Sequence, residues 1–187
     1  MRALLDRFFR DPPASCGAIT NERSLQLELG MFLRSEGYGV DFERSIKAPR
    51  LEGATLPPKH NLDLLVKKGD CSTGIELKVP LNGQHPETMY AFCADLEFLE
   101  SIKRLGAIAV GYAIMLTPDK AFWSDSGRGS AIHNLFRQSG SCIGGEIAKP
   151  TGAPDTCVLL EGRYEVAGRW SESSLLMKGS RFLVVQV

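Results

Sequence analysis

The stretches His-Asn-Leu-Asp-Leu-Leu-Val at residues 60–66 and Thr-Gly-Ile-Glu-Leu-Lys-Val at residues 73–79 decide the expected fold. Both are short apolar runs of the kind that forms buried strands, and the polar segment between them favours a turn. If the turn is centred at residues 69–70, Asp63 and Glu76 are cross-strand partners. The sequence therefore predicts a hairpin with two carboxylates facing each other on one side of a sheet.

These two carboxylates need compensating charge, because like charges opposite each other destabilise paired strands and burial raises the cost. Side chains alternate along a strand, so Lys78 shares the face of Glu76 while its apolar neighbours point the other way. A hard cation such as Mg²⁺ would add the missing charge, since it binds one or two carboxylates together with water and phosphate oxygens. The apolar flanks favour this metal site over the alternative, a partly exposed Glu–Lys pair at a sheet edge.

The composition indicates one domain that spans residues 1–187. Hydrophobic residues make up 43% of the chain, enough for a full core. The 22 basic residues balance 22 acidic ones, which argues against a protein that coats nucleic acid by bulk electrostatics. We expect no membrane span and no signal peptide, since no apolar run is long enough and residues 1–10 are interrupted by charges. Five scattered cysteines without a Cys-x-x-Cys pair fit a reduced, cytoplasmic compartment.

Apolar spacing and turn signals predict the other elements. Asn21 is expected to cap a first core helix that carries one apolar stripe and ends at Gly37. We further expect a helix at residues 1–10, a strand at 40–46, a loop at 48–59, a helix at 86–104, a strand at 107–116, a helix at 130–137 and strands at 156–160, 164–170 and 181–187.

The expected fold class is α/β, with three parts in one domain. Residues 1–20 form an N-terminal helix and loop. Residues 21–116 form a core of helix, strand, strand, strand, helix and strand (αβββαβ), in which helices flank a central mixed sheet. Residues 117–187 form a β-rich extension, which would lengthen the sheet or cover one side of it.

Asp63, the tripeptide Glu76-Leu77-Lys78 and the element order over residues 21–116 resemble the PD-(D/E)xK nuclease superfamily. The similarity extends to uncharacterised bacterial members, in which a Glu-Arg pair opens the first core helix. It covers a little over half of the chain, and Leu62 replaces the proline that opens the motif. The resemblance implies a restriction-endonuclease-like core and a DNA nuclease that depends on Mg²⁺ or Mn²⁺.

The resemblance also implies a role for each residue of the motif. Asp63 would hold one metal ion or bridge two, and Glu76 with the main-chain carbonyl of Leu77 would complete the protein ligands. Lys78 would orient or deprotonate the attacking water and offset the charge that builds on the phosphate.

Members of this superfamily often place a metal-facing glutamate on the first core helix, and Glu22 and Glu28 are the two candidates here. On a helical wheel the apolar stripe is centred nearer Glu22, so Glu22 is preferred as the ligand of a second metal or its water. The alternative for Glu22 is a favourable interaction with the helix dipole alone.

Four further residues are candidates for substrate binding. Lys47 and Lys59 belong to a modest excess of positive charge between residues 44 and 78, which is either a phosphate-binding rim or a solvated face. Gln84 lies in the loop after Lys78, where loop polarity explains it equally well. Asp95 lies on the second long helix, with an ordinary salt bridge as the alternative.

Two functions from different classes remain in view. The leading hypothesis is metal-dependent hydrolysis of phosphodiester bonds in nucleic acid, and the alternative is an inactive nuclease-fold module that binds nucleic acid or a protein partner. His85 and His133 show no partner in the sequence and are assigned no catalytic role. A homodimer is possible, since the apolar residues of the first helix would either form an interface or pack on their own domain.

Overall fold

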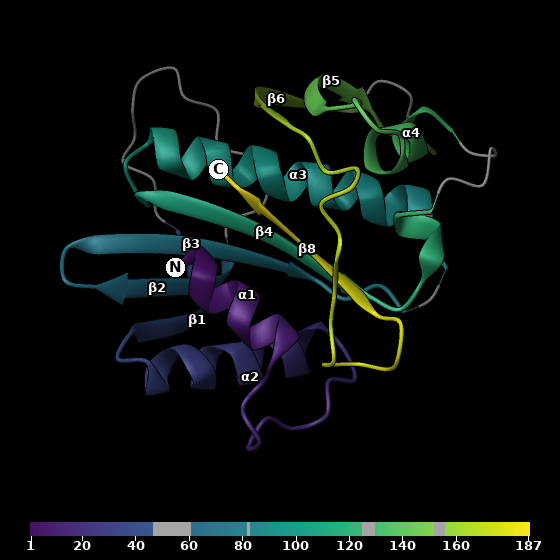
Figure 1. Ribbon diagram of the computed structural model, residues 1–187. Coiled ribbons are helices and arrows are strands. Elements are labelled where there is room, and N and C mark those ends of the chain that lie inside the picture. Colours follow the sequence, from purple (N-terminus) through teal and green to yellow (C-terminus); the bar gives the residue numbers. More distant parts are fainter. Residues whose placement is uncertain (47–60, 82, 125–129, 152–155) are drawn as a thin grey trace.

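The structure is a computed structural model that describes residues 1–46, 61–81, 83–124, 130–151 and 156–187. These residues form a mixed α/β fold with four α-helices and a six-stranded mixed sheet of order β1-β2-β3-β4-β8-β7 (Figure 1). The elements are α1 (Arg2–Arg10), α2 (Glu22–Ser35), β1 (Gly39–Ser45), β2 (Asn61–Lys68), β3 (Cys71–Lys78), α3 (His85–Arg104), β4 (Val110–Thr117), the 3₁₀ helix η1 (Lys120–Phe122), α4 (Ala131–Arg137), β5 (Ile143–Ala148), β6 (Cys157–Tyr164), β7 (Ser171–Glu172) and β8 (Arg181–Gln186).

The β2–β3 hairpin has the predicted register. Its antiparallel pairs run from Lys68 with Cys71 to Leu64 with Ile75. Gly69 in the turn has a φ of +59°, a left-handed conformation that glycine adopts without steric cost. The offset of these pairs puts Asp63 level with Glu76, as the sequence predicted.

The core order is also as expected, because α2, β1, β2, β3, α3 and β4 follow one another along the chain. Strand β1 pairs antiparallel with β2, and β4 pairs parallel with β3. Asn21 caps α2: its Oδ1 accepts the Ser24 N–H at 2.9 Å, and the Ser24 hydroxyl accepts the Asn21 N–H at 3.0 Å. The predicted loop at residues 48–59 lies outside the described residues.

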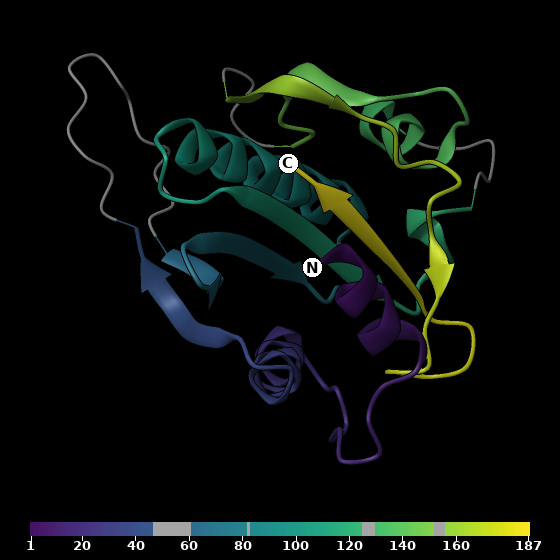
Figure 2. The same cartoon turned by 60° about the vertical axis from the view of Figure 1, so that its left-hand side comes forward.

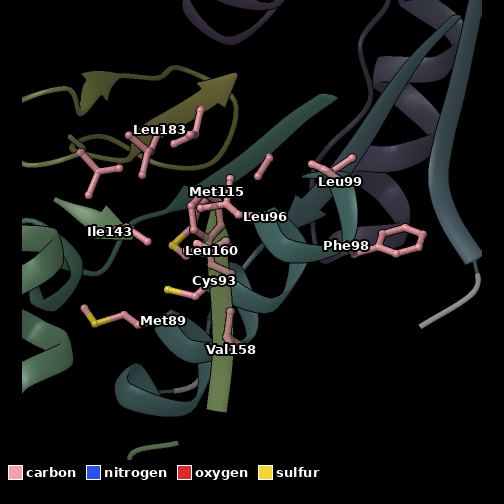
Figure 3. Close-up of a cluster of buried hydrophobic side chains, with 14 of the residues drawn as sticks. Met89, Cys93, Leu96, Phe98, Leu99, Met115, Ile143, Val158, Leu160 and Leu183 are labelled. Carbon is pink, nitrogen blue, oxygen red and sulfur yellow. The ribbon is translucent and has the colours of Figure 1, made fainter. Parts of the chain in front are cut away.

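Helices cover both faces of the sheet. Figure 2 shows α3 along one face and α1 with α2 on the other. Apolar side chains fill each layer, and Figure 3 shows part of the cluster beneath α3, where the labelled residues are Met89, Cys93, Leu96, Phe98, Leu99, Met115, Ile143, Val158, Leu160 and Leu183. A polar side chain that faces this layer is therefore removed from water, which raises the cost of any charge it carries.

The C-terminal extension does both things that the sequence allowed. Strand β8 lengthens the main sheet antiparallel to β4, while β5 and β6 form a two-stranded sheet that packs against α3. Glu100 on α3 ties β6 down, because its carboxylate accepts the N–H of Glu161, the N–H of Gly162 and the hydroxyl of Tyr164 at 2.7–2.8 Å. The carboxylate of Glu100 thus binds main-chain N–H groups of β6, as the carbonyls of a neighbouring strand would.

The strand predicted at residues 164–170 is wrong. Tyr164 ends β6, and the chain then turns at Gly168, whose φ is +77°, with a hydrogen bond of 3.1 Å from the Arg169 N–H to the Val166 carbonyl. Val166, Ala167 and Trp170 are the buried residues of this segment, and they pack in and beside a turn instead of in a strand. Strand β5 had no prediction, because Gly144 and Gly145 lower the strand propensity of its sequence.

Helix α1 packs on its own domain. Leu5, Phe8 and Phe9 are fully buried, and the Phe9 ring stacks on Phe182 of β8 with 4.9 Å between centroids. Phe8 also contacts Phe32 of α2, with 5.1 Å between ring centroids. Of the two alternatives for these residues, the structure shows the intramolecular one.

Among the described helices, none has the length and apolar character that a bilayer crossing requires. None of the five cysteines forms a disulfide.

Candidate functional site

Asp63 lies on β2 and is only 8% exposed. Its Oδ2 atom accepts a hydrogen bond of 2.8 Å from the main-chain N–H of Leu77 on β3. Leu77 lies between Glu76 and Lys78 in sequence, so this bond attaches the Asp63 carboxylate to the middle of the Glu-Leu-Lys tripeptide. A buried carboxylate is stabilised by such an N–H donor, which replaces part of its lost hydration.

Glu76 faces the layer beneath α3. The neighbouring Gly74 has the same strand parity, and a side chain there would meet Leu62 and Ile108 of the cluster beneath α3. Glu76 itself is fully buried. The predicted alternative of a partly exposed acid at a sheet edge is therefore wrong for Glu76.

Lys78 contacts a third buried carboxylate. Its Nζ atom lies 2.6 Å from Oδ2 of Asp95 on α3, and it donates to the carbonyl of Leu77 at 3.2 Å. The side chains of Lys78 and Asp95 are 17% and 5% exposed. Asp95 thus forms the salt bridge that the sequence left open, and its partner is the predicted catalytic lysine.

The site is rich in buried carboxyl groups. Asp63 on β2, Glu76 on β3 and Asp95 on α3 are all buried. Burial raises the pKa of the adjacent Cys93 thiol to about 12, with a further contribution from the Asp95 charge. Buried charges persist only with compensating partners, and oxygen-rich surroundings of this kind suit a hard cation such as Mg²⁺.

The described residues contain no group of three or more His, Cys, Asp or Glu side chains arranged to hold a metal ion. Mg²⁺ does not require such a group, because it commonly keeps several waters and binds one or two carboxylates. Asp63, Glu76 and the Leu77 carbonyl are the hard oxygen donors that would hold such an ion. The donor set therefore fits Mg²⁺ or Mn²⁺ better than a softer metal.

The structure separates the two glutamates of α2. The side chain of Glu28 lies beside Cys16 and Gly17, two residues of the loop that precedes α2. Burial, together with the Glu28 carboxylate, raises the pKa of the Cys16 thiol to about 11. Glu22 lies one helical turn before Gln26, whose side chain donates to the Asp63 carbonyl. The metal-binding role of Glu22 stays a prediction.

The substrate-binding candidates have mixed outcomes. Lys47 and Lys59 lie outside the described residues. Gln84 is exposed immediately before α3, and its contact with substrate stays a prediction. Asp95 is buried against Lys78, so it acts on the site from beneath α3 rather than from a surface open to substrate.

Two features near the site had no prediction from the sequence. One is Gln26, a buried polar residue on α2 that contacts Asp63. The other is the pair His85 and Asp119, in which His85 Nε2 lies 2.6 Å from Asp119 Oδ2. The parallel pairing of β3 and β4 is the signal that predicts this second contact, since it brings the segments that follow both strands to the same edge of the sheet.

Asp119 holds together the segments at this edge. Its Oδ1 accepts the Ala121 N–H at 2.9 Å, and its own N–H donates to the Thr117 hydroxyl, which in turn donates to the Pro80 carbonyl at 2.8 Å. Burial opposes ionisation of Asp119, but the hydrogen bonds from Ala121 and His85 outweigh it and hold the pKa of this carboxyl below its ordinary value of 3.8.

We expect Asp119→Asn to make the free energy of unfolding less dependent on pH in the acidic range. Because the pKa of Asp119 is lower in the folded state, its stabilisation is present above the unfolded-state pKa and is lost as pH falls through the folded-state pKa. The asparagine keeps an oxygen for the Ala121 N–H but cannot titrate. Urea unfolding measures the free energy of unfolding at pH 7 and at pH 3. Its decrease from pH 7 to pH 3 should be larger for the wild type than for the variant, by no more than about 1 kcal/mol because solvent screens this partly exposed group. Equal losses in both proteins would contradict the assignment.

No protein-family model matches the chain, and no curated protein or solved structure is significantly similar to it. The fold and the site define a mixed α/β protein whose β2–β3 hairpin carries two buried acidic side chains and one lysine, and the lysine pairs with a third acidic side chain on α3. A function is therefore inferred from the geometry of this site and from the motif resemblance.

Proposed function

We propose that this protein hydrolyses phosphodiester bonds of nucleic acid with a divalent metal ion, as a DNA nuclease of the PD-(D/E)xK type. One observation carries the proposal: hydrogen bonds to the backbone of Leu77 join Asp63 and Lys78 at one end of β3. Asp63 Oδ2 contacts the Leu77 N–H at 2.8 Å, and Lys78 Nζ contacts the Leu77 carbonyl at 3.2 Å. Asp63 and Lys78, which are fifteen residues apart in the sequence, thus both bind the main chain of Leu77.

The division of roles follows from the chemistry of each group. Asp63, Glu76 and the Leu77 carbonyl would hold Mg²⁺ or Mn²⁺, with Glu22 as the candidate ligand of a second ion. The metal would supply positive charge that stabilises the developing negative charge on the phosphate. The Lys78 side chain, oriented by Asp95 and by the Leu77 carbonyl, would bind the attacking water as the ammonium or take its proton as the neutral amine.

A second candidate function is an inactive module that keeps the nuclease fold and binds nucleic acid or a protein partner. The contact of 2.6 Å between Lys78 and Asp95 favours it, because the pair also joins α3 to the sheet. Glu76, fully buried, would then belong to the same internal network. The two candidates make opposite predictions about cleavage.

Asp63→Asn tests the proposed function, with Asp70→Asn as the matched control. Asp70 is exposed in the turn of the same hairpin, so its substitution leaves the site unchanged. We expect the wild type and the control to cut plasmid or duplex oligonucleotide with Mg²⁺ or Mn²⁺ and to stop in EDTA. Asp63→Asn should cut at least about 100-fold more slowly, since it removes a charged metal ligand.

Several results would count against this assignment. Cleavage that survives Asp63→Asn, or that persists in EDTA, would show a contaminating or unrelated activity. A wild-type protein that binds DNA without cutting it at saturating Mn²⁺ would support the inactive module. Parallel assays with single-stranded DNA and RNA would identify the substrate if duplex DNA is not cut.

A further inference from the structure

Gln26 is a polar side chain on the buried face of α2, and it is only 8% exposed. Its Nε2 atom donates to the main-chain carbonyl of Asp63 at 2.8 Å and to Oε1 of Glu43 at 3.0 Å. One amide nitrogen therefore links the helix to two neighbouring strands. Buried polar groups are kept where their hydrogen bonds are satisfied, and here the acceptor is the backbone of the proposed metal ligand.

The sheet is irregular at the point that Gln26 contacts. Glu43 and Asp63 lie level with each other on β1 and β2. The flanking pairs are Phe42 with Leu64 and Arg44 with Leu62 on one side, and Leu64 with Ile75 on the other. Glu43 has a φ of +47°, which residues other than glycine rarely adopt and which persists only where the surroundings hold it.

Hydrogen bonds hold both the main-chain carbonyl and the carboxylate of Asp63. Gln26 binds its carbonyl, and the Leu77 N–H binds its carboxylate at 2.8 Å. The orientation of the carboxylate depends on the backbone of Asp63, because a short side chain follows the rotation of its own main chain. A shift of that carbonyl would move the carboxylate relative to Leu77.

From this geometry we infer that Gln26 is a positioning residue for Asp63. Its amide holds the Asp63 carbonyl toward α2 and thereby keeps the carboxylate on the Leu77 N–H. The structural part of this inference stands on the hydrogen bonds alone, and its consequence for cleavage rests on the proposed function. The competing explanation is that Gln26 only joins α2 to β1 through Glu43.

A pair of substitutions separates these explanations. Gln26→Glu keeps the size of the side chain but replaces the donor by a carboxylate, which repels both the Asp63 carbonyl and Glu43. Adding Glu43→Gln restores a hydrogen bond between the two side chains, now donated from β1, and leaves the Asp63 carbonyl without its donor from α2. Glu43→Gln alone keeps an oxygen for Gln26, and Gln138→Glu, at an exposed position after α4, is a matched control.

Three measurements on the full chain decide the outcome: the urea midpoint, kcat and KM for cleavage, and hydrogen exchange of the Leu77 amide by NMR. For Gln26→Glu we expect a lower midpoint, a roughly 10- to 100-fold lower kcat at unchanged KM and faster exchange of Leu77. In the double variant the midpoint should recover, while kcat and the exchange rate should not. Both single controls should resemble the wild type.

Recovery of kcat and of Leu77 protection in the double variant would overturn the inference, because Gln26 would then act only through Glu43. If Gln26→Glu does not fold, the double variant alone still distinguishes the explanations. A wild-type protein that cuts nothing would refute the proposed function but not this inference, since Leu77 exchange reports the position of Asp63 without any need for cleavage. Unchanged Leu77 exchange in folded Gln26 variants would refute the inference by itself.

Discussion

Lys78→Met should abolish cleavage and also lower the free energy of unfolding by about 3 kcal/mol. The Lys78 ammonium lies 2.6 Å from Asp95 Oδ2 in a part of the protein where both side chains are largely withdrawn from water. Methionine fills a similar volume but leaves the Asp95 carboxylate facing an apolar side chain instead of an ammonium. Urea unfolding at pH 7 measures the loss of stability, and the plasmid assay measures the loss of activity.

Lys67→Met is the matched control for this prediction. Lys67 also pairs with a carboxylate, Asp41 at 3.1 Å, but their side chains are 50% and 46% exposed. Pairs this exposed contribute little, so we expect a change of about 0.5 kcal/mol or less and full cleavage activity. A similar loss of stability in both variants would show that the burial of the Lys78 pair has no energetic consequence.

The double variant Lys78→Met with Asp95→Asn separates stability from catalysis. Removing the second charge should recover most of the lost stability, because a neutral amide costs much less to bury than a carboxylate. Cleavage should stay absent, since the ammonium is still missing. Cleavage at the wild-type rate in either Lys78 variant would exclude a catalytic role for Lys78.

Local sequence signals were sufficient for the elements around the site. The hairpin register follows from two apolar runs and the turn between them, and it correctly places Asp63 level with Glu76. The start of α2 follows from Asn21, whose side chain forms the expected cap. These features depend on residues close in sequence, for which propensity and periodicity carry most of the information.

The contacts that complete the site depend on residues far apart in sequence. No local pattern pairs Lys78 with Asp95, or directs Gln26 toward the carbonyl of Asp63, because both contacts require α2 and α3 to be placed against the sheet. Residues 164–170 show the same limit: their alternation predicts a strand, but the turn at Gly168 and packing against neighbouring elements prevail. Tertiary packing overrides propensity in such segments.

Leu5→Ala should also lower the free energy of unfolding by about 3 kcal/mol, although α1 lies on the face of the sheet opposite α3. Leu5 is fully buried beneath α1, in the cluster that includes Phe9 and Phe182. Alanine would remove buried apolar surface and leave a cavity that rigid aromatic neighbours fill only in part. Urea unfolding measures the change, and we expect cleavage to be unaffected at temperatures where the variant is folded.

Leu27→Ala on α2 is the matched control, because Leu27 is 52% exposed and the same atoms are removed from a helix. We expect a change of about 0.5 kcal/mol or less. The comparison also bears on the homodimer that the sequence allowed. If α1 packs only on its own domain, the loss for Leu5→Ala is independent of protein concentration. A loss that shrinks on dilution would instead show that α1 is stabilised by a second copy of the chain, because the wild type then loses the stabilisation from association as it dissociates.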